Sequence, residues 1–216
     1  MKRFRVLVLI LCACLVSVAW CQQSASKGST NWSEFHRTNM TRWNPSEHVL
    51  NVDNVANLHP KWSYTTGNYV ESSPAVVNGV VYVGSWDHNV YALNASTGAK
   101  LWSYGTGWAV PSSPAVANGV VYFGSWDNNV YALNAKTGAL LWSYTTGSYV
   151  LSSPAVANGV VYVGSLDHNV YALNAKTGVK LWRYDTSKQV WSSPAVSNGV
   201  VYVGSNNGNV YAFGLK

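Results

Sequence analysis

A 40-residue repeat runs through most of this 216-residue chain and limits what the chain can fold into. The pentapeptide Ser-Ser-Pro-Ala-Val begins at residues 72, 112, 152 and 192, with no insertion or deletion between copies. A tryptophan recurs with the same period, at Trp62, Trp102, Trp142 and Trp182. A fixed period of this length is typical of repeat architectures, in which each unit buries its apolar face against its neighbours.

Each unit carries strand and turn signals along its whole length. In residues 112–151, Asn118-Gly119 lies between two apolar runs, which is the sequence typical of a type I′ hairpin turn. Short strands are predicted at 113–116, 120–124, 129–133 and 140–144, and no segment has the pattern of a helix. Four antiparallel strands in each unit predict an all-β chain that folds as a β-propeller of four-stranded blades.

The two ends of the array differ from its middle. A lone fourth strand, 61–64, precedes the first unit, and the last unit stops after a third strand, 209–213. If these two join, the chain holds four blades, and its N-terminal strand closes the last blade and hides two sheet edges. Two chains that each give four blades to an eight-bladed ring satisfy the same strand count, and so does a truncated chain. The sequence leaves these three arrangements open.

The N-terminus has the pattern of an export signal. Lys2, Arg3 and Arg5 precede an apolar run over residues 6–20, and polar residues follow. The run is shorter than the roughly 20 apolar residues of a membrane-spanning helix. We therefore predict a signal peptide at 1–21, a leader at 22–60 and the repeat propeller at 61–216. The expected location is periplasmic or extracellular, without a transmembrane segment after cleavage; lipoprotein anchoring at Cys21 is the alternative.

Removal of this signal changes how charge and cysteine content are interpreted. Three of the 14 basic residues and none of the 8 acidic ones lie in residues 1–21, so the formal net charge falls from +6 to +3. The basic character is thus partly that of the signal, and no nucleic-acid partner is expected. Cys12, Cys14 and Cys21 are the chain's three cysteines. Cleavage after Cys21 leaves no thiol for disulfides or for nucleophilic chemistry.

The repeat resembles a known one. The run VVYVGSWDHNVYALNASTGAKLWSY, with SSPAV before it, resembles the pyrroloquinoline-quinone-like (PQQ-like) repeat. The resemblance covers residues 61–216, and Ala-Leu-Asn-Ala-x-Thr-Gly-x-x-Leu-Trp is its most specific part. The family includes quinoprotein alcohol dehydrogenases and the propeller subunit of the bacterial outer-membrane assembly machinery. The resemblance implies an exported propeller, and does not by itself imply a bound quinone.

The repeats do not match the dehydrogenase pattern residue by residue. The dehydrogenases that the repeat resembles stack the quinone between a tryptophan and a ring of two adjacent, disulfide-linked cysteines, but the repeats contain no cysteine. Those dehydrogenases also hold Ca²⁺ with Glu, Asn and Asp, whereas Asp87, Asp127 and Asp167 recur here in a Ser-x-Asp-x-Asn turn and are interpreted as turn-closing residues. Near-identical units suit binding better than an asymmetric catalytic site. We predict no catalytic residue, no metal site and no cofactor; PQQ with calcium is the alternative.

Two sets of loops vary between units. They are the loops at 68–71, 108–111, 148–151 and 188–191, and the turns at 86–88, 126–128, 166–168 and 206–208. Because strands alternate in direction, both sets lie at one end of the blades, here called the variable face; the Asn-Gly and Asn-Ala-x-Thr-Gly turns form the opposite, constant face. Exposed aromatic patches mark binding sites. The predicted binding residues for a protein or small-molecule ligand are Tyr69, Trp86, His88, Trp108, Trp126, Tyr149, His168 and Trp191.

Together these features predict an exported PQQ-like propeller that acts as a non-catalytic binding or scaffolding module. A degenerate or partial quinoprotein alcohol dehydrogenase is the alternative. The periodic tryptophans are predicted to wedge neighbouring blades together rather than to stack a ligand, since a buried aromatic ring covers about 150–250 Å². A homodimer that completes an eight-bladed ring remains one of the arrangements left open.

Overall fold

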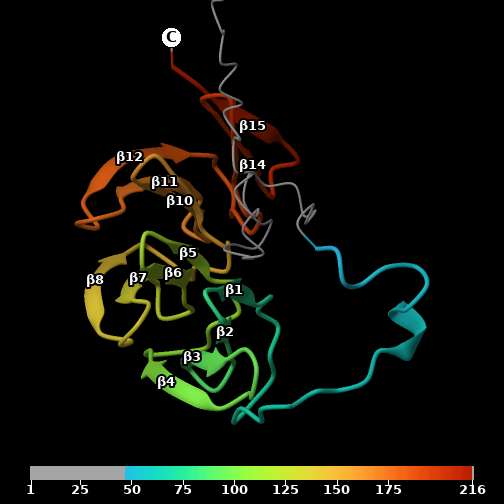
Figure 1. Ribbon diagram of the computed structural model, residues 1–216. Coiled ribbons are helices and arrows are strands. Elements are labelled where there is room, and N and C mark those ends of the chain that lie inside the picture. The colour runs from blue at the N-terminus through green and yellow to red at the C-terminus, as the bar shows by residue number, and fades with distance from the viewer. Residues whose placement is uncertain (1–46, 216) are drawn as a thin grey trace, which may run out of the picture.

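The computed structural model describes residues 47–215 and contains antiparallel sheets arranged as blades (Figure 1). The predicted signal peptide and residues 22–46 of the predicted leader lie outside this range. Residues 47–60 run outside the blades and include one short 3-10 turn, η2 (Val55–Asn57). No helix within 47–215 has the length and apolar character that crossing a bilayer requires.

The strands follow one another in space in the order of the sequence. Blade 1 comprises β1 (Ala75–Val77), β2 (Val80–Gly84), β3 (Asn89–Asn94) and β4 (Lys100–Gly105). Blade 2 comprises β5 (Ala115–Ala117), β6 (Val120–Gly124), β7 (Asn129–Asn134) and β8 (Leu140–Thr145). Blade 3 comprises β9 (Ala155–Ala157), β10 (Val160–Gly164), β11 (Asn169–Asn174) and β12 (Lys180–Asp185). Blade 4 comprises β13 (Ala195–Ser197), β14 (Val200–Gly204) and β15 (Val210–Phe213).

Turn chemistry sets the hairpin register. Asn118 and Gly119 have φ of 51° and 77°, so both central residues of the first hairpin in blade 2 adopt the left-handed conformation of a type I′ turn. This turn places Ala117 opposite Val120 and Ala115 opposite Tyr122. The predicted hairpins and the all-β propeller fold are therefore confirmed. The strand boundaries differ from the prediction by one or two residues.

Tryptophans pack each blade against the next one. Trp102 of blade 1 donates its indole N–H to the carbonyl of Ala135 in blade 2, at 3.0 Å. A Cβ on Gly138 would come within 2.8 Å of the Trp102 ring, so only glycine allows this approach. Trp142 and Gly178 repeat the arrangement between blades 2 and 3. The predicted wedge role is thus confirmed at these two interfaces, and glycine is its necessary counterpart.

Both serines of the Ser-Ser-Pro motif make hydrogen bonds. Within blade 2, the Ser112 hydroxyl accepts the Gly124 amide at 3.0 Å, which ties the loop before the innermost strand to its neighbouring strand. The Ser113 hydroxyl instead accepts the Ser73 amide at 2.8 Å, and the Ser113 amide donates to the Ser153 hydroxyl at 2.9 Å. These second serines form a chain of hydrogen bonds from blade to blade, here called the serine chain.

The N-terminal strand does not close the last blade as expected. Residues 61–65 are not assigned as a strand, and within the described range β15 pairs only with β14, so blade 4 has three strands. Trp62 instead packs on Gly98 of blade 1, in the manner of Trp102 on Gly138. The blades form an open arc, with the chain leading into blade 1 at one end and β15 at the other, so these two segments do not meet (Figure 1).

Candidate functional site

The two variable loop sets meet at one end of the blades, as predicted. The Trp126 amide in the turn of blade 2 donates to the Ala109 carbonyl in the preceding loop at 2.9 Å. The Val110 amide donates to the Ser85 carbonyl in the turn of blade 1 at 3.0 Å. Equivalent bonds recur along the arc, so each loop between blades is bonded to the turns of two blades. The backbone of the variable face is therefore fixed, and its side chains carry the differences.

One aspartate ties each of the first three blades to its loop. The Asp167 carboxylate accepts hydrogen bonds from the Tyr171 hydroxyl at 2.5 Å and the Gly147 amide at 2.7 Å through Oδ2. Its Oδ1 accepts the backbone amide of Asn169 at 3.0 Å. Asp87 and Asp127 make the same contacts in blades 1 and 2. The prediction that these aspartates close turns is confirmed, and each also holds the loop that leads into its own blade.

These bonds change the acidity of the groups involved. Burial acts to raise the pKa of Asp167, but the hydrogen bonds from Tyr171, Gly147 and Asn169 outweigh it and hold the pKa below its ordinary value of 3.8. The pKa of Asp87 is lowered in the same way. Burial and the neighbouring carboxylate raise the pKa of the Tyr171 hydroxyl. At neutral pH these two aspartates are thus charged acceptors, and Tyr171 remains a protonated donor.

Four of the predicted site residues form one aromatic cluster. Trp86 in the blade 1 turn meets Trp126 in the blade 2 turn, with ring centroids 4.5 Å apart and an edge-on orientation. Trp126 stacks on Tyr149, which lies in the loop before blade 3, at 5.5 Å and 11°. Tyr69 approaches Trp86 edge-on at 6.4 Å. These four residues, here called the aromatic cluster, span the variable face from blade 1 to blade 3.

The remaining predicted residues flank the cluster or lie apart from it. His88 stacks on Trp108 at 6.2 Å. Trp191 is tied to its own loop, because its indole N–H donates to the Gln189 side chain at 3.1 Å. His168 is exposed and makes no aromatic contact within the described range. The structure therefore joins six of the eight predicted residues by ring contacts and leaves two apart.

Backbone conformation explains which residues occupy the centre of the turns. His88 and His168 have φ of 72° and 78°, and Asn128 has φ of 72° at the same place in blade 2. Blade 4 has Gly208 there, with φ of 86°. Asn, His and Gly tolerate this left-handed conformation better than most residues do. The histidines thus occupy a position selected by backbone geometry.

Several polar atoms in this region lack a partner. The indole nitrogens of Trp86 and Trp126 and the Oδ1 of Asn128 are shielded from solvent and make no hydrogen bond within the described residues. An unmade hydrogen bond of this kind costs about 1–3 kcal/mol. Asn128 was not among the predicted site residues. Because they are shielded, these two donors and one acceptor are internal to the variable face, and a ligand would reach them only after neighbouring side chains had moved.

Several rings of the variable face are open to solvent. Tyr69 is 74% exposed, Trp108 and Trp191 are each 52% exposed, and Tyr149 is 41% exposed. Trp86 and Trp126 are half-buried. Aromatic side chains bury large areas on binding, and a group of exposed aromatic rings is typical of recognition surfaces.

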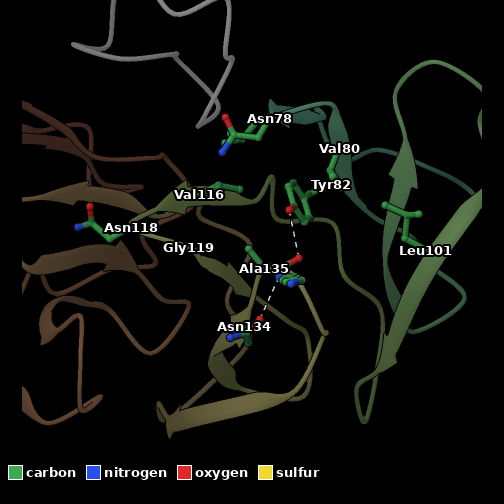
Figure 2. A pocket seen from close by; sticks show the side chains of 11 residues that line it. Asn78, Val80, Tyr82, Leu101, Val116, Asn118, Gly119, Asn134 and Ala135 are labelled. Carbon is green, nitrogen blue, oxygen red and sulfur yellow. Dashed lines mark hydrogen bonds between the residues drawn. The ribbon is translucent and has the colours of Figure 1, made fainter.

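A separate groove of about 760 Å³ lies at the constant face between blades 1 and 2 (Figure 2). Tyr82, Asn118 and Ala135 line it, and the Tyr82 hydroxyl donates to the Ala135 carbonyl at 3.1 Å across the blade boundary. None of the eight predicted site residues borders this groove. Its walls are turn and strand residues of the repeat itself, so it follows from blade packing.

The side chains of the variable face do not fit a calcium–quinone centre. Within residues 47–215 no three His, Cys, Asp or Glu side chains gather in a way that could hold a metal ion. Asp87, Asp127 and Asp167 are already acceptors for tyrosine, glycine and asparagine groups of the fold. Because these carboxylates are engaged in tying loops, we derive no reaction step through the quinone.

Sequence comparison identifies the repeats. The pattern of the PQQ-like family described as outer membrane protein assembly factor BamB matches residues 59–148 and 105–216. A quinoprotein ethanol dehydrogenase of Pseudomonas aeruginosa is 41% identical over 68 residues, which are 30% of this chain and 11% of the relative. The quinoprotein alcohol dehydrogenase PedE of Pseudomonas putida is 44% identical over 68 residues, with the same coverage. The match therefore spans only a small part of these curated relatives.

Solved structures show the same fold. BamB from Moraxella catarrhalis superposes with a TM-score of 0.64 at 22% identity, over 71% of this chain and 49% of that chain. A quinohemoprotein alcohol dehydrogenase from Pseudomonas putida HK5 gives a TM-score of 0.73 at 27% identity, over 83% of this chain and 35% of that chain. With its family pattern matched across the described blades, the chain belongs to the PQQ-like repeat family of the quinoprotein superfamily of β-propellers.

Proposed function

We propose that this chain is an exported, non-catalytic binding or scaffolding module of the cell envelope that takes its partner on the variable face. The aromatic cluster carries the proposal, because it presents the exposed rings of Tyr69 and Tyr149 on a backbone that hydrogen bonds hold in place. Export is expected from the signal-like N-terminus. The description of the matching family, an outer-membrane assembly factor, agrees with a role in the envelope.

A protein segment suits this surface best. Tyr69 and Tyr149 offer flat, exposed rings on either side of the half-buried Trp86 and Trp126. Aromatic anchors of this kind dominate the binding energy of many protein interfaces. A small-molecule ligand in place of a protein is an outcome that the experiment below distinguishes.

Replacement of Trp86 and Trp126 by leucine together should abolish partner capture without unfolding the protein. Leucine is compatible with the turn, because Leu166 occupies the equivalent half-buried position in blade 3. Removal of both indoles takes away the centre of the aromatic cluster, and we expect binding to weaken by at least about tenfold. The measurement is photo-crosslinking of the chain within envelope fractions, followed by titration of the captured partner.

The matched control replaces Lys136 and Lys176 by alanine. Both lysines lie on the constant face, in equivalent turns of blades 2 and 3. Capture should survive this change, and both double variants should melt close to the wild-type temperature. Equal capture by the leucine variant and the wild type would refute the assignment of the binding face.

A quinoprotein oxidoreductase is the second candidate. The observation that favours it is the sequence similarity to quinoprotein ethanol and alcohol dehydrogenases, 41% and 44% identical over 68 residues. We expect that addition of pyrroloquinoline quinone and Ca²⁺ to the purified chain produces neither a bound-cofactor absorption spectrum nor dye-linked alcohol oxidation. The reason is that the aspartates of the variable face are engaged by groups of the fold. A stoichiometric cofactor spectrum with turnover would establish the enzyme instead and displace the scaffold proposal.

A further inference from the structure

The two ends of the blade arc expose complementary halves of the contacts that join neighbouring blades. The boundaries between blades 1 and 2 and between blades 2 and 3 use the same small set of interactions, and the boundary between blades 3 and 4 keeps the valine–glycine and serine contacts of that set. Among the described residues, one half of this set is unmatched at blade 1 and the other half at blade 4. These contacts lie outside the aromatic cluster. They concern how the chain assembles, which the proposed function does not address.

The first contact joins a valine to a glycine. Val110 is fully buried, and a Cβ on Gly84 would lie only 2.7 Å from its Cγ1; Val150 crowds Gly124 in the same way. Val70, the equivalent residue before blade 1, is 49% exposed. Gly204 in blade 4 has no valine beside it, and a Cβ there would meet only Ser192, at 3.4 Å. Val70 and Gly204 are thus the unmatched halves of one contact.

The second contact joins a tyrosine hydroxyl to a carbonyl in the next blade. Tyr82 donates to Ala135, and Tyr122 donates to Ala175, each at 3.1 Å. Tyr202, the equivalent tyrosine of blade 4, is 42% exposed and makes no such bond within residues 47–215. In blade 1 the equivalent carbonyl, that of Ala95, accepts only the Trp62 indole among the described residues. A tyrosine donor and its carbonyl acceptor are therefore left at opposite ends.

The serine chain also has one unmatched group at each end of the arc. It runs from the Ser73 amide through Ser113 and Ser153 to the Ser193 hydroxyl. Within the described residues, the Ser193 amide has no hydroxyl to donate to, and the Ser73 hydroxyl accepts no amide. These two groups would form the next link if the ends met.

The last unmatched pair is a strand edge and an extended segment. In blade 2, Asn129 of β7 lies opposite Thr145 of β8, and the Thr145 hydroxyl donates to the Asn129 side chain at 2.6 Å. Asn209 lies two repeat periods after Asn129, and Thr65 lies two periods before Thr145, so the two ends of the arc carry the same pair of residue types. Trp62 already holds residues 61–65 against blade 1, where an outer strand of a preceding blade would lie.

We propose that two copies of this chain pair end to end, blade 4 of each on blade 1 of the other, to close an eight-bladed ring. Residues 61–65 of each copy then become the outer strand of the other copy's blade 4. Two identical end contacts related by a twofold axis satisfy both ends and leave no free edge.

A designed disulfide tests the register. Thr65→Cys with Asn209→Cys in the exported chain should give, under mild oxidation, a dimer linked by disulfides between copies. Opposed residues of an antiparallel pair have Cα atoms about 4.5–5.5 Å apart, which a disulfide spans. The matched control is Asn129→Cys with Thr145→Cys, which should form a bond within one chain. It shows that the pair geometry permits a disulfide.

The outcomes separate the arrangements. A cross-linked dimer on a non-reducing gel supports the proposal. A monomer with a disulfide between its own positions 65 and 209 would mean that one chain closes on itself, and a ladder of higher oligomers would mean an open-ended array; each overturns the ring of two. Free thiols at positions 65 and 209, when the control pair has oxidised, would also overturn it.

A second variant tests the interface without cysteines. Gly204→Ala should leave the isolated chain folded, since its Cβ meets only Ser192 at ordinary contact distance. In the dimer the same Cβ would collide with Val70, as it would at Gly84 with Val110. We expect light scattering to give twice the monomer mass for the wild type, and a dissociation constant raised by at least about tenfold for the variant. A monomeric wild type, or a variant that dimerises equally well, contradicts the proposal.

Discussion

Trp142→Ala should lower the free energy of unfolding by about 3–5 kcal/mol, because the indole fills the boundary between blades 2 and 3. The side chain is 8% exposed, donates to the Ala175 carbonyl at 3.0 Å and lies on Gly178. Truncation leaves a cavity that the rigid strands on both sides cannot fill, and it removes one of the two hydrogen bonds to the Ala175 carbonyl, which keeps its bond from the Tyr122 hydroxyl. Urea denaturation, monitored by far-ultraviolet circular dichroism, measures this free energy, because the signal comes mainly from the sheets and not from this one ring.

Trp182→Ala is the matched control at the next position of the period. Trp182 is 38% exposed and packs edge-on against Phe213 at 4.9 Å, without a glycine loop of a following unit on its other side among the described residues. Because less area is removed from water there, we expect a loss of about 1–2 kcal/mol. Equal losses for the two variants would show that the wedge contact does not depend on the loop of the next blade.

The second large effect is expected from Asp167→Ala, which should cost about 2–4 kcal/mol and release the loop into blade 3. The substitution leaves the Tyr171 hydroxyl and the Gly147 amide without their acceptor. Tyr149 lies two residues beyond Gly147 and stacks on Trp126, so the loosened loop should also weaken the aromatic cluster. Thermal melting measures the stability, and hydrogen exchange at residues 146–150 measures the release of the loop.

The same group makes stability depend on acid. The folded pKa of Asp167 is below its ordinary value of 3.8, so its carboxylate stabilises the folded state at pH values above the pKa of the unfolded group. This contribution disappears as the pH falls through the folded pKa. The melting temperature of Asp167→Asn should therefore fall less steeply below about pH 4 than that of the wild type. Parallel acid profiles would assign the acid sensitivity to other groups.

The blades could be predicted well from the sequence because their signals are local. Asn118-Gly119 specifies its own hairpin, and the period transfers that result to every unit. The position of both variable loop sets at one end of the blades could be predicted because successive strands alternate in direction. The turn role of Asp87 could be predicted from its spacing to Asn89. These inferences need only neighbours in the chain.

The pairings across blades could not be predicted in the same way. Contact between Trp86 and Trp126, or between Ser73 and Ser113, depends on the angle between two blades, and no local pattern determines that angle. The expected closure by residues 61–64 was not found for the same reason. The number of strands does not determine the rotation between neighbouring blades, so it does not determine whether the two ends of the arc meet. The unpaired Oδ1 of Asn128 likewise depends on what surrounds it in space.

The serine chain has a consequence for how such a gene can change. Since Ser73, Ser113 and Ser153 each meet the next unit through the same amide and hydroxyl, any unit can follow any other. Recombination that removed residues 112–151 would join blade 1 directly to blade 3 and recreate the same hydrogen bond. Copy number can therefore drift by whole units without an incompatible junction, and a protein of this kind can acquire a different ring size in one genetic event.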